Sequence, residues 1–138
     1  MGKINHAAAV VAAVAHWVLG AAWFTLLAVP WLAGTRIPES EMAAMKAHPS
    51  AMPYVVALVC NLLVAYTLAW VLGKDDAPSA GSGAKTGLAL GVGIAAAVIV
   101  TEMVFEARTA EFMAIAAGYP VVGSAIMGTI LGAWRKKG

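Results

Sequence analysis

Hydrophobic residues follow one another in four long runs, and polar residues are concentrated in the short segments between them. The runs cover residues 5–29, 53–72, 86–106 and 112–134 of the 138-residue chain. Each is close to the ~20 apolar residues that an α-helix needs to cross ~30 Å of hydrocarbon. The pattern predicts an all-α, polytopic membrane protein in which four transmembrane helices form one compact bundle, a single domain over residues 1–138.

The composition indicates the same class of protein. The chain is 62% hydrophobic and 12% charged, whereas soluble domains carry about 25% charged residues. Its net charge of +2 is too small to indicate nucleic-acid binding, so the expected partner is the lipid bilayer. The single cysteine, Cys60, lies in the second run, and therefore no disulfide can form within the chain.

Lysine and arginine are distributed unequally between the two ends of the predicted bundle. The first run is too long for the apolar core of a signal peptide, so we expect a retained helix. The side with both termini then holds six basic residues and the other side three: Lys3, Lys74, Lys85, Arg135, Lys136 and Lys137 against Arg36, Lys46 and Arg108. The positive-inside rule places both termini in the cytoplasm.

Signals for helix ends predict one further short helix and the start of the last long one. Pro38 suits the first position of a helix, Glu39 and Glu41 its positive end, and Lys46 its negative end. We expect a helix over residues 38–47 that lies on the membrane interface, with a gating lid as the alternative. Thr109 is a plausible N-cap for the fourth run.

Small residues recur at intervals of four along each run. Such ridges let helix backbones approach closely, so they indicate packing faces. They do not distinguish packing within one chain from packing between copies, and a homo-oligomer is one open possibility. The ridges contain Gly20 with Ala12 and His16, then Ala57, Asn61, Ala65 and Ala69, then Gly87, Gly91 and Ala95, and finally Ser124, Gly128 and Gly132.

One polar residue stands out in each predicted span: His16, Asn61, Glu102 and Tyr119. An ionisable group in a membrane span usually faces protein and has a function. Glu102 falls on the same stripe as Gly91 and is expected to face the bundle, as a proton or cation site with His16 as its relay. The alternative is structural, with each polar group hydrogen-bonded and holding helices together.

The sequence argues against a metal site or an enzyme. His6 and His16 are ten residues apart, about 15 Å along one helix, so they cannot bind one metal together. A shared haem would need a histidine from a second chain. The chain has no cysteine pair, phosphate loop or nucleophile elbow. We therefore expect no enzymatic activity, no metal and no resident cofactor.

Several segments resemble one known family. They are Leu19 to Phe24 with Pro30-Trp31, then Phe105 to Arg108, Ala117 to Tyr119 and Met127 to Trp134. Together they are similar to the small bacterial membrane proteins called domain of unknown function 1761. The resemblance implies a four-helix protein of the bacterial inner membrane, without an assigned activity.

The resemblance also directs attention to particular positions. These are Gly20, Trp23, Glu106, Arg108, Gly118 and Tyr119. It implies that Glu106 and Arg108 form an ion pair that fixes the turn between the third and fourth helices. Phe24 stands where the family pattern leads us to expect a tyrosine, which argues against a hydrogen-bonding role there.

Two hypotheses about function follow. In the first, the chain is a structural or accessory membrane protein that self-associates through its small-residue ridges. In the second, it is a small channel or carrier that moves protons, cations or a small solute past Glu102, His16 and Asn61. Binding of haem, quinone or lipid is a third possibility.

Overall fold

A computed structural model describes residues 3–135, and its secondary structure in that range is entirely helical. Four helices are long and apolar enough to cross a membrane, which confirms the predicted fold class. They are α1 (His6–Leu26), α4 (Met52–Leu72), the continuous helix Ala80–Phe105 and α7 (Ala110–Ala133). The third consists of α5 (Ala80–Leu90), a π-helical stretch η1 (Gly91–Ala96) and α6 (Ala97–Phe105).

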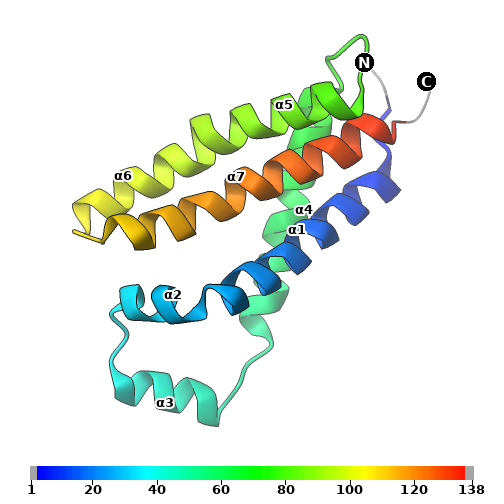
Figure 1. Ribbon diagram of the computed structural model, residues 1–138. Coiled ribbons are helices and arrows are strands. Elements are labelled where there is room, and N and C mark those ends of the chain that lie inside the picture. The colour runs from blue at the N-terminus through cyan, green and yellow to red at the C-terminus, as the bar shows by residue number, and fades with distance from the viewer. Residues whose placement is uncertain (1–2, 136–138) are drawn as a thin grey trace.

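The helix α7 is the centre of the bundle and contacts all the other spanning helices. The α5–η1–α6 helix runs alongside it on one side and α1 lies on the other, while α4 crosses α1 (Figure 1). The two ends of the described chain lie at the same end of the molecule, where the Asn5 side chain donates to the Trp134 carbonyl at 2.9 Å (Figure 1).

Glycines bring α5 and α7 into backbone contact. A Cβ atom added to Gly83 or Gly87 would collide with the carbonyl of Gly128 or Ser124, and one added to Gly128 would collide with that of Gly83. Only a residue without a side chain fits such an approach. Two of the predicted ridges therefore meet within one chain.

The apolar core lies toward the end that holds the termini. Alanines of α1 pack there against residues of α4 and α7, most of them larger and all of them buried: Ala8, Ala9, Ala12 and Ala13 against Ala65, Leu68, Leu72, Met127 and Leu131. The opposite half of α4, residues 52–60, is mostly exposed. The bundle is thus closed at one end and open between α1 and α4 at the other.

The third spanning helix begins six residues before the predicted start at position 86. Its first turn contains Gly81, Ser82 and Gly83, which are typical of a flexible link. Ser79 nevertheless caps the helix through a reciprocal pair of hydrogen bonds with Ser82. Contact between Gly83 and α7 adds a tertiary interaction that helix propensity does not include.

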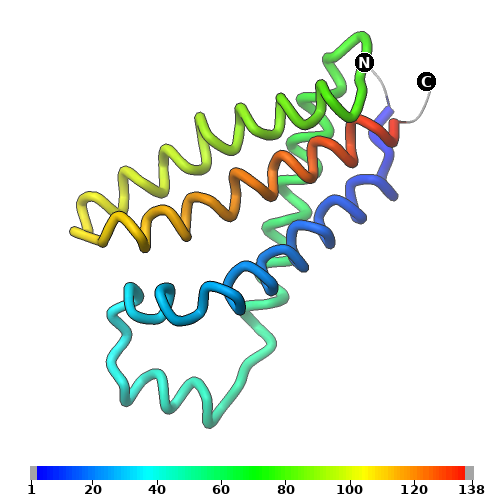
Figure 2. Tube along the Cα trace, in the orientation of Figure 1, coloured from blue at the N-terminus to red at the C-terminus, as the bar shows by residue number. Residues whose placement is uncertain are grey.

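The first loop contains two helices instead of one. The chain bends at Leu27 and continues as α2 (Ala28–Thr35), so the loop predicted to start at Pro30 starts later (Figure 2). Pro30 is tolerated in α2 because it falls in the first turn of that helix. The helix α3 (Glu39–Ala47) lies at the predicted position and packs against no other described element.

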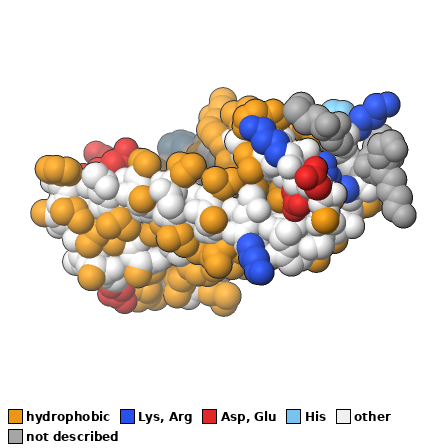
Figure 3. All heavy atoms as spheres, turned by 90° about the horizontal axis from the view of Figure 1, so that it is seen from above, with side chains coloured by type: hydrophobic (Ala, Val, Ile, Leu, Met, Phe, Trp, Pro, Cys, Tyr) orange, Lys and Arg blue, Asp and Glu red, His pale blue; other side chains and the backbone are white. Residues whose placement is uncertain are grey.

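Hydrophobic side chains cover much of the surface between the two ends of the molecule. In the view of Figure 3, lysine and arginine side chains are seen in the half that carries the termini, where acidic side chains also lie, and further acidic side chains are seen at the other end. This distribution is suited to a bilayer, because the apolar middle would face lipid and the charged ends would face water.

Candidate functional site

Three of the four polar residues predicted inside the spans meet where α1, α4 and α7 cross. The rings of His16 and Tyr119 lie 4.4 Å apart, centroid to centroid. The Tyr119 hydroxyl donates to the His16 carbonyl at 3.0 Å, and the Asn61 side chain lies beside the same hydroxyl. We call these three residues the polar cluster.

The polar cluster is buried but incompletely hydrogen-bonded. His16 is 4% exposed and Asn61 is 7% exposed. Neither ring nitrogen of His16, nor the Asn61 amide nitrogen, has a partner among the described residues. A buried polar atom without a hydrogen bond costs about 1–3 kcal/mol. The cluster therefore has unused capacity to bind a polar group.

Aromatic side chains of the α1–α7 interface each lie opposite a glycine. A Cβ added to Gly20 would come within 2.8 Å of the Tyr119 hydroxyl oxygen, and one added to Gly118 within 2.9 Å of the Trp23 ring. Trp23 also donates its indole N–H to the Ile115 carbonyl at 3.0 Å. Four positions indicated by the family resemblance thus form two complementary pairs.

A cleft opens beside the polar cluster, between α1, α7 and the half of α4 that lies farther from the termini, which we call its outer half (Figure 1). Its volume is about 580 Å³, within the range of small-molecule sites. Aromatic side chains make up much of its wall, and small residues occupy the rest. The lining residues are Trp17, Gly20, Ala21, Phe24, Thr25, Pro53, Tyr54, Ala57 and Tyr119.

A series of aromatic rings connects the polar cluster with the turn between α6 and α7. Phe24 lies 5.4 Å from Tyr119 and 4.7 Å from Trp31, and Trp31 stacks on Phe112 at 4.5 Å. This arrangement explains a phenylalanine at position 24, because its ring only has to fill space between two others. It also holds α2 against the start of α7.

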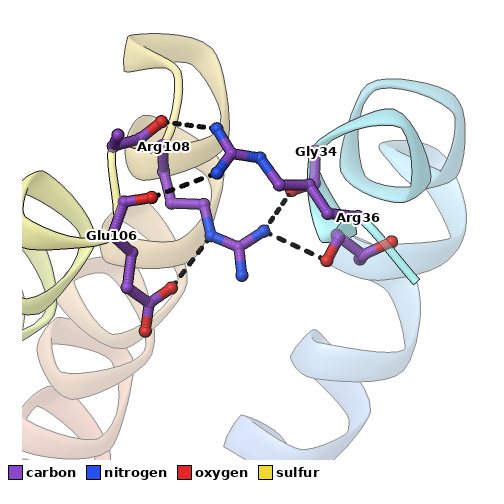
Figure 4. A network of polar contacts seen from close by, with 6 residues as sticks. Gly34, Arg36, Glu106 and Arg108 are labelled. Atoms are coloured by element: carbon purple, nitrogen blue, oxygen red, sulfur yellow. Dashed lines mark hydrogen bonds and ion pairs between the residues drawn. The ribbon is translucent and has the colours of Figure 1, made fainter. Parts of the chain in front are cut away.

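Two arginines then link the ends of α2 and α6 reciprocally (Figure 4). Arg108 donates to the carbonyls of Gly34 and Thr35, at 2.7 and 3.0 Å, and pairs with the Glu106 carboxylate at 2.9 Å. Arg36 donates to the carbonyls of Glu106 and Ala107. Each guanidinium thus lies at the negative end of the other helix, where a cation is stabilising. We call this arrangement the arginine clamp.

Backbone strain marks the same place. Arg36 and Ala107 are the only described non-glycine residues with positive φ, at 57° and 53°. The left-handed conformation costs a non-glycine residue about 1–2 kcal/mol. It turns the chain sharply at the ends of α2 and α6, which is the usual geometry of a helix C-terminus. The clamp's hydrogen bonds offset that cost.

Glu102 does not lie where the sequence pattern placed it. The prediction that it faces the bundle is wrong, since Glu102 is exposed on α6 and lines only a shallow hollow with Ala97, Val98 and Thr101. The reason is η1: a π-helix takes up one extra residue, which rotates the following residues by about 100°. Ile99 and Met103 turn inward in its place.

The predicted packing residues are placed at two interfaces. Gly87, Gly91, Ser124, Gly128 and Gly132 lie where α7 meets α5, its N-cap and the start of η1, and Gly20 lies between α1 and α7. Sequence reasoning overlooked Arg36, Trp31 and Phe112. Only the Pro30-Trp31 signature pointed to one of these three, because their contacts join segments far apart in the sequence.

Metal binding finds no support among residues 3–135, where no three His, Cys, Asp or Glu side chains come together in a way that could hold an ion. The His6 ring nitrogen instead lies 3.0 Å from the Tyr66 hydroxyl oxygen, toward the end of the bundle that carries the termini. Cys60 is an exposed free thiol on α4.

Comparison with known proteins identifies one family. The family described as protein of unknown function (DUF1761) matches residues 7–132, which is nearly the whole chain and includes the polar cluster, the cleft and the arginine clamp. No curated protein and no solved structure matches. The resemblance inferred from the sequence is thereby confirmed.

Proposed function

The chain belongs to the DUF1761 family, and we propose that it is a structural or accessory protein of the bacterial inner membrane. In this proposal it is not an enzyme, both termini are cytoplasmic, and it self-associates through the outward face of α5, η1 and α6. The excess of basic residues at the end with the termini supports the orientation.

The observation that carries the proposal is a second small-residue ridge on the third spanning helix. Ala89, Gly93, Ala97 and Thr101 follow one another at intervals of four, and all are exposed. A Cβ added to Gly93 would meet no atom within 4 Å. Small residues at this spacing let two membrane helices approach closely. The first ridge of the same helix is already occupied by α7, so the second is free for another chain.

The position of Glu102 also supports self-association through this face of the third spanning helix. It neighbours Thr101 at the end of the second ridge, in a segment apolar enough to cross the membrane. A charged group that faces lipid is costly, by about 2.5–3.5 kcal/mol on insertion scales at the helix centre and less toward the interface. Contact with a second copy would remove the carboxyl group from lipid. Self-association therefore gives Glu102 a protein neighbour in place of lipid.

The test compares self-association of three variants in bilayers. A fluorophore on Cys60, the only cysteine, reports the number of copies per particle by photobleaching. Gly93→Leu places a large side chain on the second ridge and should weaken association at least about tenfold, a loss of about 1.4 kcal/mol. Gly93→Ala and Ala22→Leu, the latter on an exposed part of α1, should associate like the unmodified chain.

A single copy per particle at every protein density would refute self-association. Unchanged association of Gly93→Leu would show instead that the copies meet through another face.

Transport is the second candidate, and the unpartnered atoms of His16 and Asn61 favour it. Buried groups of this kind inside a span are typical of ion pathways. Glu102 lies outside the polar cluster, so a route through all three residues would need a second copy. Proton and cation flux into proteoliposomes distinguishes the candidates. Flux that Glu102→Gln abolishes in a well-folded protein would establish a carrier or channel, and absence of flux would leave the accessory role.

A further inference from the structure

The cleft between α1, α4 and α7 is separate from the ridge on α5, η1 and α6. No residue of the α5–η1–α6 helix lines it. Its properties can therefore be considered, and tested, independently of self-association. Its opening is bounded on one side by Pro53, Tyr54 and Ala57 of α4 and on the other by residues of α1. All these helices are of membrane-spanning length, so the opening between α1 and α4 gives access to a molecule dissolved in the bilayer.

The walls of the cleft favour a flat, uncharged molecule. Trp17, Phe24, Tyr54 and Tyr119 contribute aromatic rings, which pack well against other rings. None of the described residues that line the cleft is charged. A phosphate or ammonium headgroup would therefore lose its hydration there without gaining an ionic partner.

Hydroxyl groups give the cleft a polar lining. Tyr119 lines the cleft, but its hydroxyl already donates to the His16 carbonyl. Asn61 lies beside that hydroxyl, yet its amide nitrogen is buried and does not line the cleft. Thr25 lines the wall, and its hydroxyl has no hydrogen bond to a described residue, unlike those of Thr67, Thr101 and Thr129.

We propose that this cleft binds a flat, uncharged ring compound that dissolves in the bilayer and carries carbonyl oxygens. The ring packs between the aromatic walls. A carbonyl oxygen accepts a hydrogen bond from the Thr25 hydroxyl at the wall. Quinones have these properties. No electron transfer is part of the proposal, since binding alone gives the Thr25 hydroxyl a partner.

Nuclear magnetic resonance of the indole N–H groups in nanodiscs tests the proposal with menadione as the probe. The Trp17 indole N–H donates to the Tyr54 carbonyl at 3.1 Å across the cleft, so its resonance should shift as the cleft fills. The resonances of Trp70 and Trp134, which do not line the cleft, should stay in place. The Trp17→Phe variant assigns the signal.

Two pairs of controls make the outcome specific. Ala21→Phe fills the cleft from α1 and should abolish the saturable shift, whereas Ala22→Phe, on the neighbouring exposed residue, should preserve it. If Ala21→Phe misfolds, Ala57→Phe fills the cleft from α4 and should likewise abolish the saturable shift. Methylnaphthalene has the same fused rings without carbonyl oxygens and should bind about tenfold more weakly, as expected for the loss of about one hydrogen bond from the Thr25 hydroxyl.

Three results would overturn the proposal. A shift of equal size in all the indole resonances would mean that menadione merely dissolves in the bilayer. Equal affinity for menadione and methylnaphthalene would remove the hydrogen-bonding role. No saturable shift, with phospholipid acyl chains found in the cleft by cross-linking, would identify the cleft as a lipid-filled groove.

Discussion

At the scale of single residues, three arginines each cap a helix other than the one they follow. Arg36 and Arg108 exchange partners in the arginine clamp, and Arg135 at the end of α7 donates to the Leu72 carbonyl of α4 at 2.6 Å. The last carbonyls of a helix lack partners within it. These three side chains thus join helix ends that are far apart in the sequence.

Arg108→Ala should lower the free energy of unfolding by about 2 kcal/mol, because it leaves the carbonyls of Gly34 and Thr35 without charged donors. Glu106→Gln should change it by less than about 1 kcal/mol, because the Glu106 side chain is 56% exposed and its ion pair is screened by water. Unfolding in mixed micelles measures both. Equal losses would assign the stability to the ion pair and not to the capping bonds.

His16→Leu should raise the free energy of unfolding by about 1 kcal/mol, because it replaces two unpartnered buried nitrogens with a side chain of similar volume. Asn61→Leu is the corresponding change on α4. Thermal unfolding in detergent measures the effect. A marked loss of stability in His16→Leu would mean that the histidine ring has a hydrogen-bond partner, such as bound water.

At the scale of elements, the third spanning helix presents two different small-residue ridges on two faces. Gly83, Gly87 and Gly91 meet α7, whereas Ala89 and Gly93 begin the exposed ridge. The π-helical stretch separates the part of the helix that packs through glycines from α6, which packs through larger side chains. One helix can therefore serve an internal interface and an external one.

Gly87→Ala should destabilise the fold by about 2 kcal/mol, since its new methyl group would collide with the Ser124 carbonyl of a closely packed neighbour. Gly93→Ala is the matched control in the same helix. It meets open space and should be neutral or stabilising by up to about 1 kcal/mol, because alanine favours helix more than glycine does. Unfolding of the two variants under identical conditions tests the assignment of the two faces.

At the scale of the whole molecule, the bundle is tightly packed at the end with the termini and open at the other. Buried residues of α4 start at Asn61, and the outer half of the helix diverges from α1. The cleft is the consequence of that divergence. Of the two short helices between α1 and α4, α2 packs against α7 and is held by the arginine clamp, whereas α3 packs against no described element.

The orientation predicts opposite reactivity for two engineered thiols. In a Cys60→Ser background, Ala47→Cys in α3 should react with a membrane-impermeant maleimide in intact spheroplasts, and Ala77→Cys between α4 and α5 should react only after lysis. Both positions are exposed, so access to the reagent depends on the side of the membrane. The reverse pattern would place the termini outside.

The sequence by itself determined the four spanning helices, the short helix α3 and the N-cap at Thr109, whose hydroxyl accepts from the Phe112 N–H at 3.2 Å. These features depend on apolar length and on contacts within a few residues. It also indicated all three residues of the polar cluster, because polar groups in an apolar run are conspicuous. The Glu106–Arg108 pair was indicated by the resemblance to the family.

Only the tertiary structure decided which faces meet. The extra residue in η1 turned Glu102 outward, contact with α7 extended α5 toward Ser79, and Phe112 and Arg108 held α2 in place. Each of these depends on energy gained between segments far apart in the chain. The periodicity of residues within one helix does not show which other helix each of its faces contacts. A stripe of residues can therefore be recognised correctly and still be assigned to the wrong neighbouring helix.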